Sequence, residues 1–321
     1  MTKPDPRAAA RCPACDGDMA GPAFAAALPG FSVLACPACG LGRTWPPVPA
    51  GKIGAYYPQQ YYGSENVRFN PLFEAMTRLF QRRRARLLSR LAAPGAVLDV
   101  GCGRGFLLAY LRLMGYEPRG LELSEHAAWH ARHRLGLEVA SADFLSFSAR
   151  PESFDMIVFW HTLEHFPEPE KCLSRAAELL KPAGLLAVAV PNFASLQARL
   201  FGRHWFHLDI PRHYTHFSER SLRALLERRR LGIARIDHFC FEQNPFGWLQ
   251  SFYNALGFER DFLYSMLKAR SARALRIRRH PIQALLTLAL LPLLLPLSLA
   301  LTLLEAALRR GGTIEVYAIK R

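Results

Sequence analysis

A short apolar run that leads into three closely spaced glycines constrains this chain more than any other feature. The run 97–100 contains Asp99, and a helical pattern follows the glycines at 106–114. The glycines are Gly101, Gly103 and Gly105. Glycine adopts backbone angles that other residues resist, and it lets a ligand approach the main chain closely. The GxGxG spacing is tighter than in dinucleotide-binding turns, and no Lys-Ser/Thr pair follows as in a P-loop. The sequence therefore predicts an α/β domain with a ligand cradle where its first strand ends.

Four further apolar segments continue the alternation of strand and helix. Strands are predicted at 115–122, 137–140, 153–160 and 185–190, with turns or helical patterns between them. The first of these ends in Glu122, about 20 residues past the glycines, where an acid suits the two hydroxyls of a ribose. Together with the glycine motif, this order resembles the class I S-adenosylmethionine (SAM)-dependent methyltransferases. A nucleotide-binding domain of another class is the alternative.

The resemblance implies a doubly wound, seven-stranded α/β sheet that binds SAM as its cofactor. Glu122 would take the ribose hydroxyls, Asp143 would contact the adenine, and Phe144 would pack beside its ring. The cofactor-binding residues implied are Asp99, Gly101, Cys102, Gly103, Gly105, Glu122, Leu123, Asp143, Phe144 and Trp160. The Leu-Glu-His-Phe segment at 163–166 resembles the ubiquinone-type and related small-molecule methyltransferases.

Two CxxC pairs near the start of the chain predict a metal site. Cys12 and Cys15 form one pair, Cys36 and Cys39 form the other, and twenty residues separate the pairs. Two such turns complete a tetrahedral four-cysteine site that leaves no open position for water, so Zn²⁺ would be structural there. A redox-active CxxC or a pair of disulfides is the alternative. A zinc ribbon followed by paired tyrosines resembles the N-terminal module of bacterial methyltransferases that act on sugars and other small molecules. The tyrosines are Tyr56, Tyr57, Tyr61 and Tyr62.

Histidines follow the predicted fourth and fifth strands, at the edge where open α/β sheets bind ligands. Methyl transfer from a sulfonium needs mainly alignment, and a general base helps when the acceptor is a hydroxyl or an acidic carbon. The expected alternative bases are His165, His213 and His216. The expected acceptor contacts are His161, Arg212 and Tyr214. Packed histidines, or a histidine-rich lid that holds itself together, are the alternative. No Asn-Pro-Pro-aromatic motif follows the fourth strand, which argues against methylation of base amines.

An uncharged, leucine-rich run at 284–304 separates the predicted sixth strand, 232–241, from the seventh, 313–319. In the resembled family these two strands pair as an antiparallel hairpin, so the run must leave and return on the same side. Two membrane spans need about 40 residues, and this run is about half that length. Basic residues on both sides of the run place both of its ends on the cytoplasmic side. Because Pro292 and Pro296 lie near its middle, we expect a re-entrant or interface-lying helical hairpin. A soluble helical cap or a dimerisation element is the alternative.

The basic composition of the chain is weak evidence for a nucleic-acid partner. Its 321 residues carry a formal net charge of +15, but 35 of the 41 basic residues are arginine. That excess is typical of a genome-wide composition bias, so we do not expect nucleic acid to be the partner. The predicted domains are a zinc ribbon at 1–50, an aromatic linker and helix at 51–94, the SAM-binding domain at 95–241 with 311–321, and a membrane-associating insertion at 242–310.

These expectations combine into a SAM-dependent methyltransferase at the inner face of the cytoplasmic membrane. Reduced cysteines and the methyl donor place its folded domains in the cytosol, and 268–310 would contact the membrane surface. Its acceptor would be a small molecule, a glycan or a lipid-linked compound. The alternatives are an RNA methyltransferase that uses the ribbon and basic helices, and a non-catalytic SAM-binding scaffold in a membrane biosynthetic complex. The sequence names neither the acceptor nor the oligomeric state.

Overall fold

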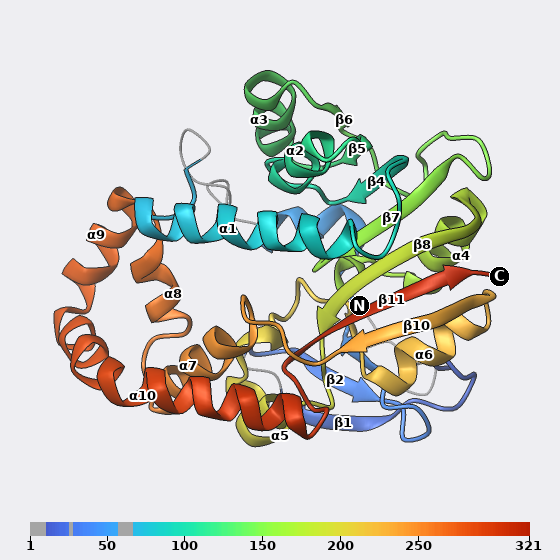
Figure 1. Cartoon of the computed structure of the whole chain (residues 1–321). Helices are drawn as coiled ribbons and strands as arrows, with labels where there is room; N and C mark the ends of the chain where they lie inside the picture. The colour runs from blue at the N-terminus through green and yellow to red at the C-terminus, as the bar shows by residue number, and fades with distance from the viewer. Residues whose placement is uncertain (1–10, 26–27, 57–66) are drawn as a thin grey trace.

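A seven-stranded sheet forms the centre of the molecule (Figure 1). The computed structural model describes residues 11–25, 28–56 and 67–321. The strand order is β10-β11-β8-β7-β4-β5-β6, and β11 runs antiparallel to both of its neighbours. The strands are β4 (Ala96–Val100), β5 (Glu117–Leu121), β6 (Glu138–Ala140), β7 (Phe154–Trp160), β8 (Leu180–Pro191), β10 (Leu231–Asp237) and β11 (Thr313–Lys320). The predicted doubly wound sheet and the antiparallel pairing of its last two strands are confirmed.

Helices cover both faces of this sheet, which explains why its central strands are apolar throughout. One face packs on α1 (Pro71–Leu88) and α2 (Phe106–Leu113), with α3 (Glu125–Leu135) beside α2. The other face packs on α4 (Pro169–Leu179) and α6 (Glu219–Glu227). Ser124 and Ser218 cap α3 and α6 through their side-chain oxygens, as their position before each helical pattern predicts.

A second, four-stranded sheet joins the N-terminal ribbon to the histidine-rich segment. Its order is β1 (Ala20–Ala25), β2 (Ser32–Ala35), β3 (Gly42–Trp45) and β9 (Thr215–His216). The antiparallel partners of β3 and β9 are Gly42 with His216 and Arg43 with Thr215. A 3₁₀ helix follows at Ala50–Tyr56. The other three tyrosines of the expected aromatic linker, Tyr57, Tyr61 and Tyr62, lie outside the described residues.

Four helices lie between β10 and β11 and make up the insertion. They are α7 (Asn244–Ala255), α8 (Phe262–Leu267), α9 (Arg270–Arg279) and α10 (Pro281–Ala307). The expected helical hairpin within the leucine-rich run is wrong, because α10 continues through Pro292 and Pro296 as one helix. Proline has a helical φ and removes only one backbone donor, and packing of Leu294 against Leu249, Tyr253 and Leu263 supports the helix. The chain therefore leaves the sheet through α7–α9 and returns along the whole of α10.

The junction between α10 and β11 is tightly packed. A Cβ atom on Gly311 would lie 2.0 Å from the His238 carbonyl oxygen, and one on Gly312 would lie 2.5 Å from Gln197 Nε2. The Gly312 amide donates to Glu305 Oε1 over 3.1 Å, and Asn192 Nδ2 donates to the Gly311 carbonyl over 2.9 Å. The end of α10 is thereby held directly against the sheet.

Candidate functional site

The glycine loop lies where β4 ends, and its conformation requires glycine. Gly101 has a φ of +77°, and a Cβ atom there would lie 2.6 Å from Thr162 Cγ2. The amides of Gly101 and Cys102 donate to the Leu121 carbonyl over 2.8 Å and 3.0 Å, which ties the loop to β5. Glycine is therefore required at this position both by the backbone angle and by the close approach of Thr162.

Glu122 connects the glycine loop to the turn that follows β5. Its Oε2 accepts from the Gly103 amide over 2.9 Å, and its Oε1 accepts from the Ser124 amide over 2.8 Å. The side chain is buried, and a carboxylate oxygen can accept more than one hydrogen bond. This arrangement fits a ribose diol bound beside the loop, so the residues suit SAM.

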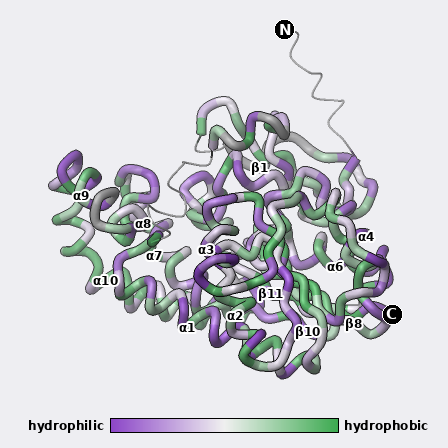
Figure 2. Tube along the Cα trace, turned by 90° about the horizontal axis from the view of Figure 1, so that it is seen from above, coloured by the Kyte–Doolittle hydropathy of each residue, from purple (hydrophilic) through white to green (hydrophobic). Residues whose placement is uncertain are grey.

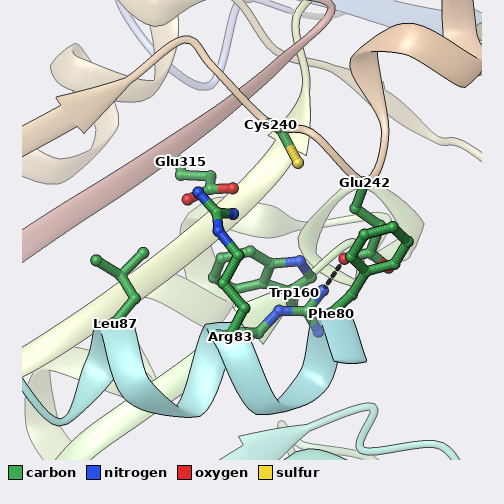
Figure 3. Close-up of a pocket in the computed structure, with 8 residues that line it drawn as sticks. Phe80, Arg83, Leu87, Trp160, Cys240, Glu242 and Glu315 are labelled. Carbon is green, nitrogen blue, oxygen red and sulfur yellow. Dashed lines mark hydrogen bonds and ion pairs between the residues drawn. The ribbon is translucent and has the colours of Figure 1, made fainter. Parts of the chain in front are cut away.

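Arg84 places a buried cation beside Trp160, at the end of β7. Its guanidinium lies 3.9 Å from the centre of the Trp160 ring and forms an ion pair of 2.6 Å with Glu242. Burial raises the pKa of Asp99 to about 7, which the charge of Arg84 partly opposes. The small pocket here is lined by Phe80, Arg83, Arg84, Leu87, Trp160, Cys240, Glu242 and Glu315 (Figure 3).

The sequence analysis did not single out Arg84, although a signal was present. Arg84 lies four residues from both Phe80 and Leu88, on the apolar side of the α1 pattern, where a cation needs a partner. Its burial beside Trp160 follows from that position.

The remaining expected cofactor residues differ in how accessible they are. Asp143 and Leu123 are exposed, and Asp143 Oδ1 accepts from the Leu145 amide over 2.9 Å. Cys102 is half-buried against Gly120 of β5. Phe144, expected beside the adenine, is only 1% exposed and packs edge-on against Phe159 at 5.2 Å. Its side chain therefore belongs to the core beneath the loop, because the aromatic cluster buries it.

Three side chains meet after the end of β7. The ligand atoms of Glu164, His165 and His213 all lie within 4.8 Å of one another. His165 Nδ1 lies 3.1 Å from the Arg212 carbonyl, and His213 Nδ1 lies 3.0 Å from the His207 carbonyl. Because a carbonyl only accepts, each Nδ1 carries the proton in the neutral ring, which leaves each Nε2 as an acceptor.

Glu164 is the residue of this group that the sequence analysis missed. It is 1% exposed, and neither carboxylate oxygen has a hydrogen-bond partner among the described residues. Burial raises the pKa of Glu164 to about 7. A buried carboxylate without a partner is costly, so a proton or a divalent cation shared with the two histidines would stabilise it. Its signal in the sequence is an acid between leucine and histidine, directly after a buried strand.

The three candidate bases differ in exposure and in partners. His216 is buried, with Nε2 3.0 Å from Thr44 Oγ1, and burial lowers its pKa to about 3. His213 is also buried, and burial lowers its pKa well below the ordinary value. His165 is half-buried. Geometry therefore favours His165 as the group that meets an acceptor.

The expected acceptor contacts divide between the site and the ribbon. The Arg212 guanidinium holds Asp209 Oδ1, with its Nε at 3.0 Å, and stays half-buried beside His165. His161 Nδ1 lies 3.4 Å from Glu164 Oε1, and burial lowers the pKa of His161 to about 4. Tyr214 is buried, and its hydroxyl donates to the Val48 carbonyl over 3.1 Å. Its side chain is thus used by the ribbon contact rather than presented to an acceptor.

The four ribbon cysteines are positioned as a metal-binding set. Cys12 Sγ lies 3.4 Å from Cys39 Sγ, Cys15 Sγ lies 3.5 Å from Cys36 Sγ, and all four sulfurs lie within 4.8 Å of one another. Tetrahedral zinc with bonds of about 2.3 Å would hold sulfurs about 3.8 Å apart. The cysteines are free thiols, so the donor set fits structural Zn²⁺.

Comparisons with known proteins agree with this geometry. A family model described as a methyltransferase domain matches residues 72–233. The ubiquinone biosynthesis O-methyltransferase of Xanthomonas campestris pv. campestris (strain B100) is 31% identical over 168 residues, which cover 48% of this chain and 70% of that protein. The protein of the same name from Azoarcus sp. (strain BH72) is 35% identical over 111 residues, so that the match spans 33% of this chain and 47% of the relative. A SAM-dependent methyltransferase structure from Archaeoglobus fulgidus has a TM-score of 0.48 at 20% identity, with 78% of this chain and 98% of that chain covered.

Proposed function

Since this chain belongs to the methyltransferase-domain family whose model it matches, we propose that it methylates a small-molecule, glycan or lipid-linked acceptor at the cytoplasmic face of a membrane, with SAM as donor. One observation carries the catalytic part of this proposal. The glycine loop with Glu122, and the half-buried His165, lie at the same carboxyl edge of the sheet, after β4, β5 and β7. A donor held by the first group would meet an acceptor held by the second.

His165 is the base in this proposal. Bound SAM supplies an electrophilic methyl group on a sulfonium. The acceptor oxygen or carbon would give its proton to His165 Nε2 as its bond to the methyl carbon forms, while the bond from that carbon to sulfur breaks and the sulfur leaves as a neutral thioether. Donation from His165 Nδ1 to the Arg212 carbonyl fixes the tautomer in which Nε2 is the acceptor.

Methyl transfer from labelled SAM to a membrane extract tests the catalytic part. The expected result is a labelled lipid or glycan that gains one methyl group by mass spectrometry, with the wild-type chain but not with His165→Asn. Tight SAM binding without label in any lipid, glycan or small-molecule fraction would contradict an enzyme and favour the scaffold. Label in RNA alone would contradict the acceptor class.

The membrane part of the proposal rests on α10, whose polar side chains face inward and whose outward side chains are apolar. Thr287, Ser298 and Thr302 face inward and are at most 1% exposed. Their hydroxyls donate to the carbonyls four residues earlier. The outward side is apolar, with five side chains between 59% and 72% exposed: Ile282, Leu285, Leu288, Leu293 and Leu303. An aqueous surface favours the opposite arrangement, so this face suits an apolar environment.

The neighbouring charges support an anionic lipid surface as the proposed occupant. α9 carries Arg273, Arg276, Arg278 and Arg279 directly before α10, and α8–α10 project from one side of the molecule (Figure 2). Each arginine near an anionic leaflet contributes about 1 kcal/mol of attraction. Within the described residues, α10 is also the helix long and apolar enough to cross a membrane. Its fixed junction with β11 favours a helix that lies in the interface instead.

Vesicle flotation with a triple variant tests this surface. Changing Leu285, Leu293 and Leu303 together to Gln removes apolar contact from the outward face, and we expect at least tenfold weaker binding to phosphatidylglycerol vesicles. A matched control changes three leucines exposed elsewhere, Leu113, Leu200 and Leu256, and should bind as the wild type does. Equal binding by both variants would contradict the assignment. A concentration-dependent dimer without vesicle binding would give this face to a second copy of the chain.

A further inference from the structure

A cluster of cations lies between the histidines and the membrane-proposed helices. It begins where the segment before α1 runs antiparallel to the segment after α8. Phe69 pairs with Lys268, the Asn70 amide donates to the Leu267 carbonyl over 3.0 Å, and the Ala269 amide donates to the Arg68 carbonyl over 3.2 Å. This pairing brings Arg68 beside Lys268, although 200 residues of chain separate them.

Tyr264 holds both of these cations. The Arg68 guanidinium donates to the Tyr264 hydroxyl and lies 5.8 Å from the ring centre. Lys268 Nζ lies 5.3 Å from the centre of the same ring. Phe206 and Phe246 pack against the other parts of Tyr264, so that the ring is fixed in place. Two long cationic side chains are therefore ordered around one aromatic ring.

Arg212 connects this pair to the catalytic histidines. Its carbonyl is the partner of His165 Nδ1, its guanidinium pairs with Asp209, and its charge helps to lower the pKa of Lys268. Burial, together with the charges of Arg68, Arg276 and Arg212, lowers the pKa of Lys268, and only Asp261 opposes this. The ammonium is thus surrounded by charges of its own sign.

The nearby acids are largely occupied by other partners. Asp209 pairs with Arg212, Glu259 pairs with Arg276 and His280, and Asp261 bonds to Asn254. Among the residues that the structure describes, no carboxylate forms an ion pair with Lys268. A half-buried lysine in this position needs an anion that the described chain does not supply.

We propose that Lys268 and Arg68 bind the phosphate group of an amphiphilic acceptor. This inference rests on the proposed function and specifies its acceptor class. Arginine forks and a lysine point charge together suit the several oxygens of a phosphate. The methyl-accepting group would then lie toward His165, while the apolar tail would extend along α8 toward the leucines of α10. In this arrangement His165 would meet the reacting group, Lys268 and Arg68 would meet the phosphate, and α10 would meet the end of the tail.

Binding of short soluble probes tests the phosphate site without knowledge of the natural acceptor. Geranyl phosphate carries both the tail and the charge, geraniol carries the tail alone, and inorganic phosphate carries the charge alone. We expect calorimetry to show tighter binding of geranyl phosphate than of either other probe. Lys268→Gln should weaken geranyl phosphate about tenfold, since one charge-assisted contact is lost, and should leave geraniol unchanged. Lys268→Arg should restore most of the affinity.

Two controls separate this proposal from the general function and from simple loss of charge. Arg223→Gln, on the exposed side of α6, removes the same charge and should bind geranyl phosphate as the wild type does. SAM affinity should be unchanged in Lys268→Gln. A failure of the wild type to bind SAM would overturn the proposed function and leave the phosphate site standing. Equal affinities for geraniol and geranyl phosphate would overturn the phosphate site, as would a Lys268→Gln variant that binds normally. Inorganic phosphate that binds as tightly as geranyl phosphate, and through Lys268, would assign the site to a free phosphate and overturn the amphiphilic acceptor.

Discussion

The proposed cofactor side and the proposed acceptor side of this molecule are built in different ways. The expected SAM residues come mainly from one continuous stretch, Asp99 to Phe144, in which each strand and its following turn place the next contact. The acceptor side brings together β3 of the ribbon, the turn after β7, the histidine segment with β9, and the start of α9. A locally built site depends on few distant contacts, whereas an assembled site depends on all of its parts. Changes on the acceptor side should therefore alter turnover and leave SAM binding intact, and the reverse should hold on the cofactor side.

The largest expected effect is the loss of the base on the acceptor side. His165→Asn removes the Nε2 acceptor, and we expect the kcat of methyl transfer to fall roughly 10²–10⁴-fold. Calorimetry should give an unchanged dissociation constant for SAM. A variant that retains full turnover would assign the base to another group, and one that loses SAM binding as well would break the division into two sides.

A second test compares a buried acid on each side through the pH dependence of stability. The folded state raises the pKa of Glu164 from 4.5 to about 7, so folded chains hold a proton that unfolded chains release. The contribution of Glu164 to the free energy of unfolding should thus fall as the pH rises from 4.5 to 7 and then level off. Glu164→Gln should remove roughly 3 kcal/mol of this fall, measured by urea unfolding at pH 5 and pH 8.

Asp99→Asn should act in the same direction, because burial also raises the pKa of Asp99 to about 7. Comparing each variant with the wild type removes the opposite contribution of the buried histidines. A Glu164→Gln variant that keeps the whole pH dependence would mean that this carboxylate has a partner in solution, such as a metal ion.

The cofactor side has its own test at Glu122. Glu122→Ala removes the acceptor of the Gly103 and Ser124 amides, together with the predicted contact to the ribose hydroxyls. SAM binding should weaken by roughly 1.5–3 kcal/mol, and acceptor affinity at saturating SAM should be unchanged. Unaltered SAM affinity would remove the ribose assignment.

The smallest effect reports on the contact between the ribbon and the acceptor side. Thr44→Val deletes the hydroxyl that donates to the His213 carbonyl over 2.5 Å and that lies beside His216 Nε2. We expect a loss of about 0.5–1.5 kcal/mol in stability and a modest rise in the KM for the acceptor. Thr77→Val, which deletes a hydroxyl on α1, is the matched control and should change neither acceptor KM nor zinc content.

The same division decides what the sequence could predict. The glycines after β4, the acid after β5 and the serine caps of α3 and α6 are local signals, and the structure places them as expected. The pairing of β9 with β3 was not predicted, because it joins residues more than 170 positions apart through only two residue pairs. For that reason Tyr214 was expected at an acceptor, although its hydroxyl is used by Val48.

Tertiary contacts that the sequence does not show also decide other positions in the structure. The pattern of α1 separates apolar from basic positions, but only the position of Trp160 and Glu242 explains why Arg84 is buried. Phe144 follows an expected adenine contact in the chain, yet Phe159 and Phe166 draw its ring into the core. The two prolines of α10 predict a break, which packing against α7 prevents. In each of these three cases, a tertiary contact decides what the local sequence pattern does not.

The close packing at Gly311 and Gly312 has a consequence for how far the protein can reach. With no room for a side chain at either position, α10 cannot swing relative to β11 without opening contacts to His238 and Gln197. If α10 rests on a bilayer, the catalytic edge of the sheet then stands at a set height above the lipid. A fixed height would select acceptors by the distance between their membrane anchor and the atom that receives the methyl group.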